Sequence, residues 1–159
     1  MAFHRRILER VPGFDVELGA GALGSGEETL FSRQLLAAGF RLVSSFDAEV
    51  EHHFDIMRLS ADKLLSSACN IGRSHAYIFY HWEHQRSRMA FPRLILSRMK
   101  RLWTRYWAKS ATYRGSAVSL AALKAEQEHA FYREYLIQRR RPRKYALRGL
   151  TPLATNTEE

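Results

Sequence analysis

The feature that most constrains the fold of this 159-residue chain is the helical periodicity of its sequence after Ser60. Apolar residues recur there at spacings of three and four, which places them on one face of a helix. Ser60 is a candidate N-cap for a first helix, a second has Pro92 near its N-terminus, and a third covers about residues 116–139. Gly72 interrupts the first, where a small residue permits close packing or the approach of a bound molecule. The pattern predicts that most of the chain is helical.

The N-terminal third of the chain predicts shorter elements. Periodicity indicates a short helix over residues 3–11 and another over residues 27–38, for which Ser25 is a plausible N-cap. Residues 41–46 and 49–53 are typical of two short strands joined by a turn. We therefore expect an α+β chain in which helices predominate.

Acid and imidazole side chains follow the glycine- and alanine-rich loop of residues 19–26. Such a loop is either a plain connector or a place where backbone approaches a ligand closely. Glu27 and Glu28 open the next helix, where its dipole favours negative charge and where a carboxylate is also available for acid/base chemistry. His52 and His53 are adjacent on a predicted strand, so they point to opposite faces. At most one of them is expected to join a given site.

The net charge of +9 is concentrated in the middle of the sequence. Residues 1–83 carry 8 Lys/Arg and 11 Asp/Glu, residues 84–125 carry 10 Lys/Arg and no acid, and residues 126–159 carry 7 against 5. The candidate polar site thus lies in the mildly acidic part. We expect a surface- or anion-binding region to follow it.

The basic, tryptophan-rich helix predicted over residues 93–109 has three interpretations. Tryptophan and tyrosine with Lys/Arg are typical of a helix lying at an anionic membrane surface. Basic and aromatic residues also bind nucleic acid, but no known nucleic-acid module accompanies them, so that partner is not expected. The third interpretation is an amphipathic core helix with a solvated basic face. The first and third remain open from the sequence.

Length and cysteine usage set further limits. The chain has the length of one domain, and its single cysteine, Cys69, excludes an internal disulfide and fits a reducing compartment. No apolar h-region follows Met1, and no run of about 18 apolar residues predicts a membrane span. We expect a cytoplasmic location, either free or peripheral at the inner membrane face.

Five short segments in the N-terminal third share the order and spacing of one enzyme family. They are Met1-Ala2-Phe3-His4-Arg5-Arg6, Val11-Pro12-Gly13-Phe14-Asp15, Gly26-Glu27-Glu28-Thr29, Ala38-Gly39-Phe40-Arg41-Leu42-Val43 and Asp47-Ala48-Glu49-Val50-Glu51-His52. Together they resemble the C-terminal half of a family 2 glycosyltransferase domain. Pro12 departs from the family's usual glycine.

This resemblance implies a nucleotide-diphospho-sugar transferase with a GT-A, Rossmann-like fold. It implies that Glu28 is the general base that deprotonates an acceptor hydroxyl, with Glu27 as its neighbour in the pair. Glutamate replaces the family's aspartate at Glu28, which keeps the chemistry but lengthens the side chain. Asp15 and Gly26 match the acceptor side, and His52 matches a histidine that helps to hold a divalent metal, Mg or Mn, on the sugar diphosphate.

The family's nucleotide-binding half and its Asp-x-Asp motif have no counterpart in the sequence. We therefore expect an N-terminally truncated enzyme that is inactive alone. The expected domains are residues 1–56, the C-terminal portion of the transferase domain with its two short strands, then residues 57–145, a basic amphipathic helical extension. Residues 146–159 are expected to be a disordered tail.

Two functions follow from these expectations. The first is a fragment of a glycosyltransferase that moves a sugar from a nucleotide-diphospho-sugar to a glycan or lipid-linked acceptor, in polysaccharide biosynthesis. The alternative is a non-enzymatic helical protein that binds anionic membrane surfaces through the basic helix at residues 93–109.

Overall fold

Four α-helices make up most of the part of the protein that a computed structural model describes. It describes residues 2–45, 47, 49–51, 53, 55–110 and 118–146, with the backbone alone at 107–110. The α-helices and two short 3-10 turns are, in chain order, η1 (Arg5–Glu9), α1 (Glu27–Ala37), η2 (Ile56–Leu59), α2 (Ala61–His81), α3 (Ala90–Ser110) and α4 (Leu120–Gln138).

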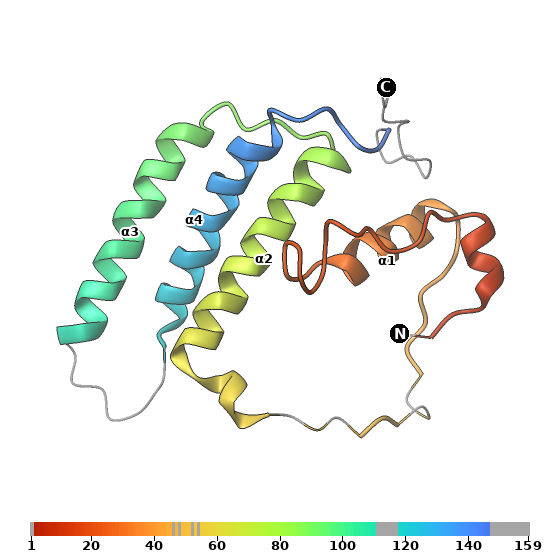
Figure 1. Ribbon diagram of the computed structural model, residues 1–159, viewed down its shortest axis with the longest axis horizontal. Coiled ribbons are helices and arrows are strands. Elements are labelled where there is room, and N and C mark those ends of the chain that lie inside the picture. The colour runs from red at the N-terminus through yellow and green to blue at the C-terminus, as the bar shows by residue number, and fades with distance from the viewer. Residues whose placement is uncertain are drawn as a thin grey trace.

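The three long helices lie side by side in a single row, with α4 in the middle (Figure 1). Helices α2 and α4 run in the same direction, and α3 runs opposite to both. The N-terminal segment with η1 and α1 packs on the other side of α2. The glycine-rich loop and α3 therefore lie at opposite ends of the molecule, with α2 and α4 between them.

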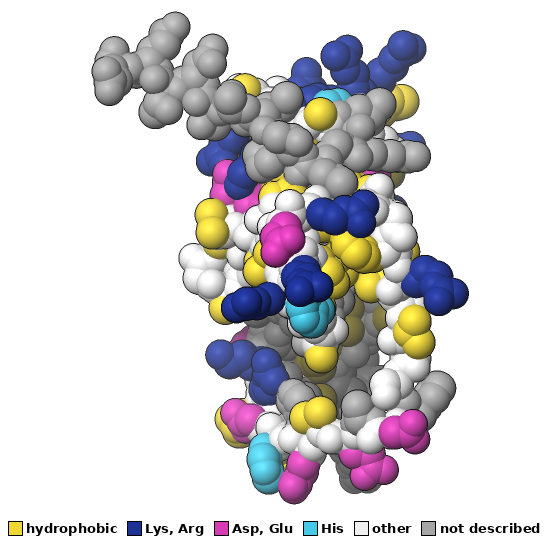
Figure 2. All heavy atoms as spheres, turned by 90° about the vertical axis from the view of Figure 1, so that its right-hand side faces the viewer, with side chains coloured by type: hydrophobic (Ala, Val, Ile, Leu, Met, Phe, Trp, Pro, Cys, Tyr) yellow, Lys and Arg dark blue, Asp and Glu magenta, His cyan; other side chains and the backbone are white. Residues whose placement is uncertain are grey.

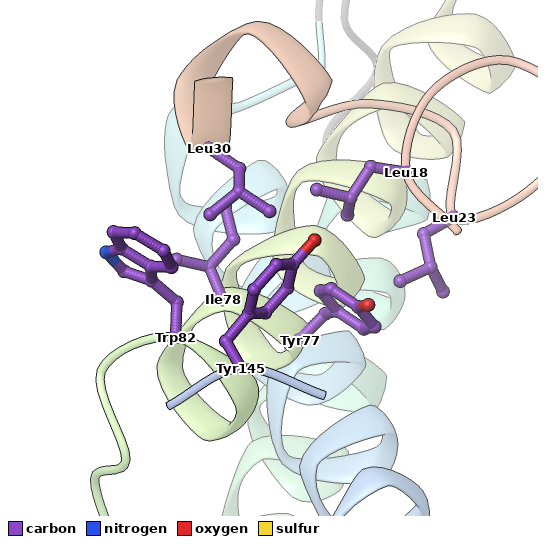
Figure 3. Close-up of a cluster of buried hydrophobic side chains, with 7 residues drawn as sticks. All are labelled: Leu18, Leu23, Leu30, Tyr77, Ile78, Trp82 and Tyr145. Carbon is purple, nitrogen blue, oxygen red and sulfur yellow. The ribbon is translucent and has the colours of Figure 1, made fainter. Parts of the chain in front are cut away.

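One apolar cluster fastens the N-terminal segment to α2. Buried side chains from the glycine-rich loop, α1, α2 and the segment after α4 converge there (Figure 3): Leu18, Leu23, Leu30, Tyr77, Ile78, Trp82 and Tyr145. Burying such side chains stabilises a fold by about 1.5–3 kcal/mol each. This cluster positions the loop that precedes α1.

A second cluster joins α2 to α4 and the start of α3. Its buried members are Ala76, Ala90, Tyr132 and Tyr135. Further along the same helix pair, a Cβ added at Gly72 would lie 2.2 Å from the carbonyl oxygen of Gln127. The glycine in α2 therefore serves close helix packing, one of the two purposes predicted for it.

The long helices agree well with the sequence prediction. Ser60 precedes α2 as its N-cap residue, although its side chain makes no capping bond. Ser119 caps α4, and its Oγ accepts a hydrogen bond from Ala122 N at 3.2 Å. The helix predicted over residues 3–11 is only the single turn η1.

The two predicted strands are wrong, and so is the GT-A expectation. Residues 41–45, 49–51 and 53 have no regular secondary structure, and the described part of the chain contains no strand or sheet. A strand needs a neighbour to bond its backbone N–H and C=O groups, and no described segment provides one. Val43 and Val50 are accordingly 82% and 85% exposed. The described fold is a helical domain rather than an α/β or α+β one.

Helix α3 faces α4 with polar side chains. Arg93 Nη1 donates to the Tyr132 hydroxyl at 3.0 Å, and Ser97 Oγ lies 3.4 Å from His129 Nδ1. Further along, Arg101 and Arg105 both bond Glu126 at 3.2 Å. Arg93, Arg98, Lys100 and Arg105 are nevertheless exposed, as predicted for a solvated basic face. The structure differs from the prediction of a core helix in that several basic residues bond α4 while most of the large apolar side chains of α3 remain exposed.

None of the helices within the described residues is both long enough and apolar enough to span a membrane.

Candidate functional site

The turn before α1 is built by Gly26 rather than by Ser25. Gly26 is the N-cap residue, with φ +92°, and a Cβ there would lie 2.8 Å from Ser74 Cβ. A side chain at this position is therefore excluded both by backbone conformation and by contact with α2. The Ser74 hydroxyl donates to Ser25 O, and the two serine hydroxyls lie 3.2 Å apart. The predicted N-cap at Ser25 is wrong because Ser25 is bonded to α2 instead.

Glu27 and Glu28 occupy the first turn of α1 but differ in exposure. Glu27 is half-buried, and its carboxyl group lies next to Gly19, where an added Cβ would come within 3.1 Å of Cδ. Glu28 is exposed to solvent. Both carboxylates interact favourably with the N-terminal end of the helix dipole. Of the two, the Glu28 carboxylate is the more accessible to solvent.

Asp15 is buried in a polar cluster away from solvent. Its carboxylate accepts hydrogen bonds from the Tyr77 hydroxyl at 2.8 Å, from Lys144 Nζ at 2.6 Å and from the Tyr145 hydroxyl. Its Oδ1 also accepts from Glu17 N at 3.0 Å. Asp15 thus shapes the loop and ties it to α2 and to the segment after α4. These bonds do not run to Glu27 or Glu28.

The electrostatics of this cluster keep Asp15 ionised. Burial alone would raise the pKa of Asp15, but the hydrogen bonds donated by Lys144, Tyr145, Glu17 N and Tyr77 outweigh it and lower that pKa. Burial and the neighbouring carboxylate raise the pKa of the Tyr77 and Tyr145 hydroxyls, so both remain donors. All of these donors bond the Asp15 carboxylate, so the buried polar groups of the cluster are satisfied. The cluster is therefore a stable anchor.

A second buried polar chain links α2 to α4, and sequence reasoning missed it. His81 Nδ1 accepts from Lys144 N at 3.1 Å, which leaves the proton on Nε2 to donate to Gln138 Oε1, also at 3.1 Å. Gln138 Nε2 in turn donates to Glu134 Oε1 at 2.6 Å. Burial lowers the pKa of His81, so the ring stays neutral. Nothing in the sequence signals this chain, because His81 and Gln138 are 57 residues apart.

A polar hollow of about 730 Å³ adjoins the glycine-rich loop. Gly24 and Ser25, directly before Gly26 and the glutamate pair, form one wall of it. The rest of the lining is rich in hydroxyl, amide and charged side chains: His53, Asp55, Arg58, Lys63, Ser66, Ser67 and Asn70. This chemistry suits a hydroxyl-rich ligand, because such groups donate and accept hydrogen bonds in many directions.

The face that carries the N-terminal segment is mixed in charge. Figure 2 shows acidic side chains gathered at its lower end and Lys and Arg distributed above them. The exposed acids of residues 47–55 include Glu49, Glu51 and Asp55. This face therefore lacks the single-sign charge that characterises residues 84–125.

The predicted metal ligand, His52, lies outside the described residues. In its neighbour His53, the Nε2 atom lies 3.8 Å from Glu51 Oε1. Among the residues that the structure describes, no three His, Cys, Asp or Glu side chains are grouped to hold a metal ion. Those residues therefore do not by themselves fit a divalent metal centre.

No family model matches the chain, and no curated protein and no solved structure matches it significantly.

Proposed function

We propose that the glycine-rich loop, the start of α1 and the adjoining polar hollow form the acceptor side of a nucleotide-sugar-dependent glycosyltransferase. The observation that carries the proposal is the hollow of about 730 Å³, whose lining includes Gly24 and Ser25, the residues that precede Gly26 and the Glu27–Glu28 pair in the sequence. Neither glutamate is itself among the lining residues. The five ordered segments that resemble family 2 glycosyltransferases support it independently.

In the proposed reaction, Glu28 is the general base. The oxygen of an acceptor hydroxyl bonds to the anomeric carbon of the donor sugar, while the bond from that carbon to the phosphate oxygen breaks. The nucleoside diphosphate leaves with the electron pair, and the Glu28 carboxylate takes the hydroxyl proton. Glu27, half-buried against Gly19, orients the first turn of α1. Asp15 and Gly26 shape the acceptor side by holding the loop to α2.

The substrates proposed are a nucleotide-diphospho-sugar donor and a glycan or lipid-linked acceptor. These 159 residues contain no Asp-x-Asp motif, so we propose that donor binding and its divalent metal, Mg or Mn, require a partner that supplies one. The location proposed is cytoplasmic, at the inner face of the membrane, where lipid-linked acceptors are found. The chain alone is therefore expected to bind an acceptor without turning over a donor.

Acceptor binding is tested on the chain itself. Saturation-transfer difference NMR with a panel of monosaccharides and oligosaccharides should give signals for at least one glycan. Replacing exposed Ser67 in the hollow (Ser67→Trp) should abolish those signals, whereas Val16→Trp, at an exposed position before the loop, should not. A folded chain that binds no glycan would remove the acceptor assignment.

The role of Glu28 is tested in a polypeptide that joins this chain to a donor-binding transferase half. Glu28→Gln should abolish sugar transfer while donor binding persists, because the amide cannot accept the proton. Glu9→Gln, an exposed glutamate in η1, is the matched control and should transfer normally. Full turnover by Glu28→Gln would show that another group is the base.

A further inference from the structure

The outer face of α3 is apolar along its described length. Phe91, Met99 and Tyr106 are 63%, 62% and 68% exposed, and each lies about two helical turns from the next. Ile95, Leu96, Leu102 and Trp103 are also exposed and complete what we call the outer stripe: Phe91, Ile95, Leu96, Met99, Leu102, Trp103 and Tyr106. Soluble domains rarely expose so many large apolar side chains side by side, so the outer stripe marks an interaction surface.

The polar contacts between α3 and α4 keep the outer stripe facing solvent. Lys100 Nζ donates to Glu128 at 3.1 Å, and Glu126, a buried carboxylate, accepts from Arg101 and Arg105. Turning α3 to bury the outer stripe would break these bonds and would leave the buried Glu126 charge unpaired, which is costly. The exposure of the outer stripe is therefore built into the packing of the helices.

The charges around the outer stripe select an anionic partner. Residues 84–125 contain ten Lys/Arg and no Asp/Glu. Arg86 and Arg88 lie exposed just before α3, Arg98 is exposed beside the outer stripe, and Lys124 is exposed on α4. A second copy of this chain docked face to face would bring these like charges together, which is unfavourable. The same positive charges attract an anionic surface, so its binding is favourable.

A groove between α3 and α4 runs beside the outer stripe. Its volume is about 610 Å³, and its apolar lining comes from Leu96, Met99 and Trp103 on one helix and from Ala121 and Ala125 on the other. Thr104, Lys124 and the ion pair of Lys100 with Glu128 also line it. An apolar groove with Lys124 at its border matches a phospholipid, whose acyl chain is apolar and whose phosphate is negative.

We propose that the outer stripe and this groove dock on an anionic phospholipid membrane. Tryptophan and tyrosine on the apolar side with Lys/Arg at its edges are the composition of helices that lie in the bilayer interface. The four aliphatic members of the outer stripe distinguish this partner from nucleic acid, where basic side chains meet phosphates and aromatic rings stack on bases. The docking face lies at the opposite end of the molecule from the proposed acceptor site (Figure 1). The two proposals are therefore independent.

The test is co-sedimentation of the full chain with vesicles. We expect binding to vesicles of phosphatidylcholine mixed with phosphatidylglycerol, weaker binding to phosphatidylcholine alone, and weakening by salt. The double substitution Ile95→Ser and Leu102→Ser should lower the partition coefficient at least about tenfold, because two large apolar side chains no longer enter the membrane. Both residues are exposed, so the variant should fold, which circular dichroism checks.

Matched controls separate the outer stripe from general apolar exposure. Val43→Ser with Val50→Ser alters two apolar residues of the N-terminal segment that are more exposed than Ile95 and Leu102, and it should leave vesicle binding unchanged. Arg98→Glu with Lys124→Glu should weaken binding to anionic vesicles more than binding to neutral ones. Every one of these variants should still bind glycan, which would confirm that the acceptor site is separate.

Three outcomes would overturn the proposal. One is a folded chain that does not bind anionic vesicles. Another is a double variant that binds them as well as the wild type does. The third is the absence of vesicle binding together with another partner. A wild-type dimer that the double variant converts to a monomer would assign the outer stripe to a second copy of the chain. Tight binding to single-stranded DNA would assign it to nucleic acid.

Discussion

The Tyr145 hydroxyl donates a hydrogen bond to the Asp15 carboxylate from 130 residues further along the chain. Tyr77, in α2, donates to the same carboxylate, and Lys144 forms an ion pair with it. A single buried acid therefore connects the glycine-rich loop, α2 and the segment after α4. The loop that carries the proposed acceptor site depends on this connection for its position.

Removing the Asp15 carboxylate should destabilise the whole domain. We expect Asp15→Ala to lower the free energy of unfolding by about 3 kcal/mol, because it breaks a buried ion pair and leaves two tyrosine hydroxyls without their acceptor. Tyr145→Phe should cost about 1–2 kcal/mol, since it removes one hydrogen bond to a charged group. Urea denaturation followed by circular dichroism measures both, and exposed Val16→Ala is the control, expected within about 0.5 kcal/mol of wild type. Equal stability of Asp15→Ala and wild type would refute the anchor.

Acid should destabilise the domain in two separate pH windows. Burial holds the folded pKa of His81 below 6.5, so the unfolded state binds more protons and stability falls as the pH drops below that value. Asp15 has a folded pKa below 3.8, so its contribution is complete above that value and is lost as the pH falls further. Denaturation curves across the pH range should show the two losses in this order.

Single substitutions assign the two windows. His81→Gln should flatten the dependence in the upper window, and any remainder belongs to His129, whose pKa burial also lowers. Asp15→Asn should flatten the lower window alone. A His81→Gln variant with an unchanged upper window would show that His81 is not buried neutral in the folded protein.

Gly72→Ala should loosen the α2–α4 contact. The added methyl group would lie 2.2 Å from the Gln127 carbonyl oxygen and 3.1 Å from Ala130 Cβ, so the helices must separate. Overpacking of this kind costs about 1–3 kcal/mol, which outweighs the gain of up to about 1 kcal/mol in helix propensity. Lys124→Ala, at an exposed position on α4, is the control. A variant more stable than wild type in thermal melts would mean that the contact is not close.

Glu126→Ala should weaken the packing of α3 on α4, while α2 and α4 stay packed on each other. The substitution removes the shared acceptor of Arg101 and Arg105, and we expect a loss of about 1–3 kcal/mol. Amide hydrogen exchange should quicken in α3 and remain slow in α2 and α4, which are joined by the Tyr132 and Tyr135 cluster. Glu128→Ala, which removes only the more exposed pair with Lys100, should have a smaller effect. Uniformly faster exchange in all three helices would contradict this independence.

The sequence by itself determined where the long helices lie. Periodicity and capping residues act over one or two turns, so α1, α2, α3 and α4 were predictable within a few residues. The strands were not, because β structure requires a partner segment that local pattern cannot supply. Close packing was one of two purposes predicted for the glycine in α2, and only the structure identifies Gln127 as its neighbour.

Only the tertiary structure decided which face of α3 is exposed and where Asp15 lies. The helix pattern shows an apolar and a basic face, yet it does not say which one meets α4; the ion pairs with Glu126 and Glu128 decide that. The resemblance placed Asp15 on an acceptor side, and the fold buries it under Tyr77 and Tyr145. Both outcomes depend on residues distant in sequence, because burial and charge pairing are properties of the packed chain.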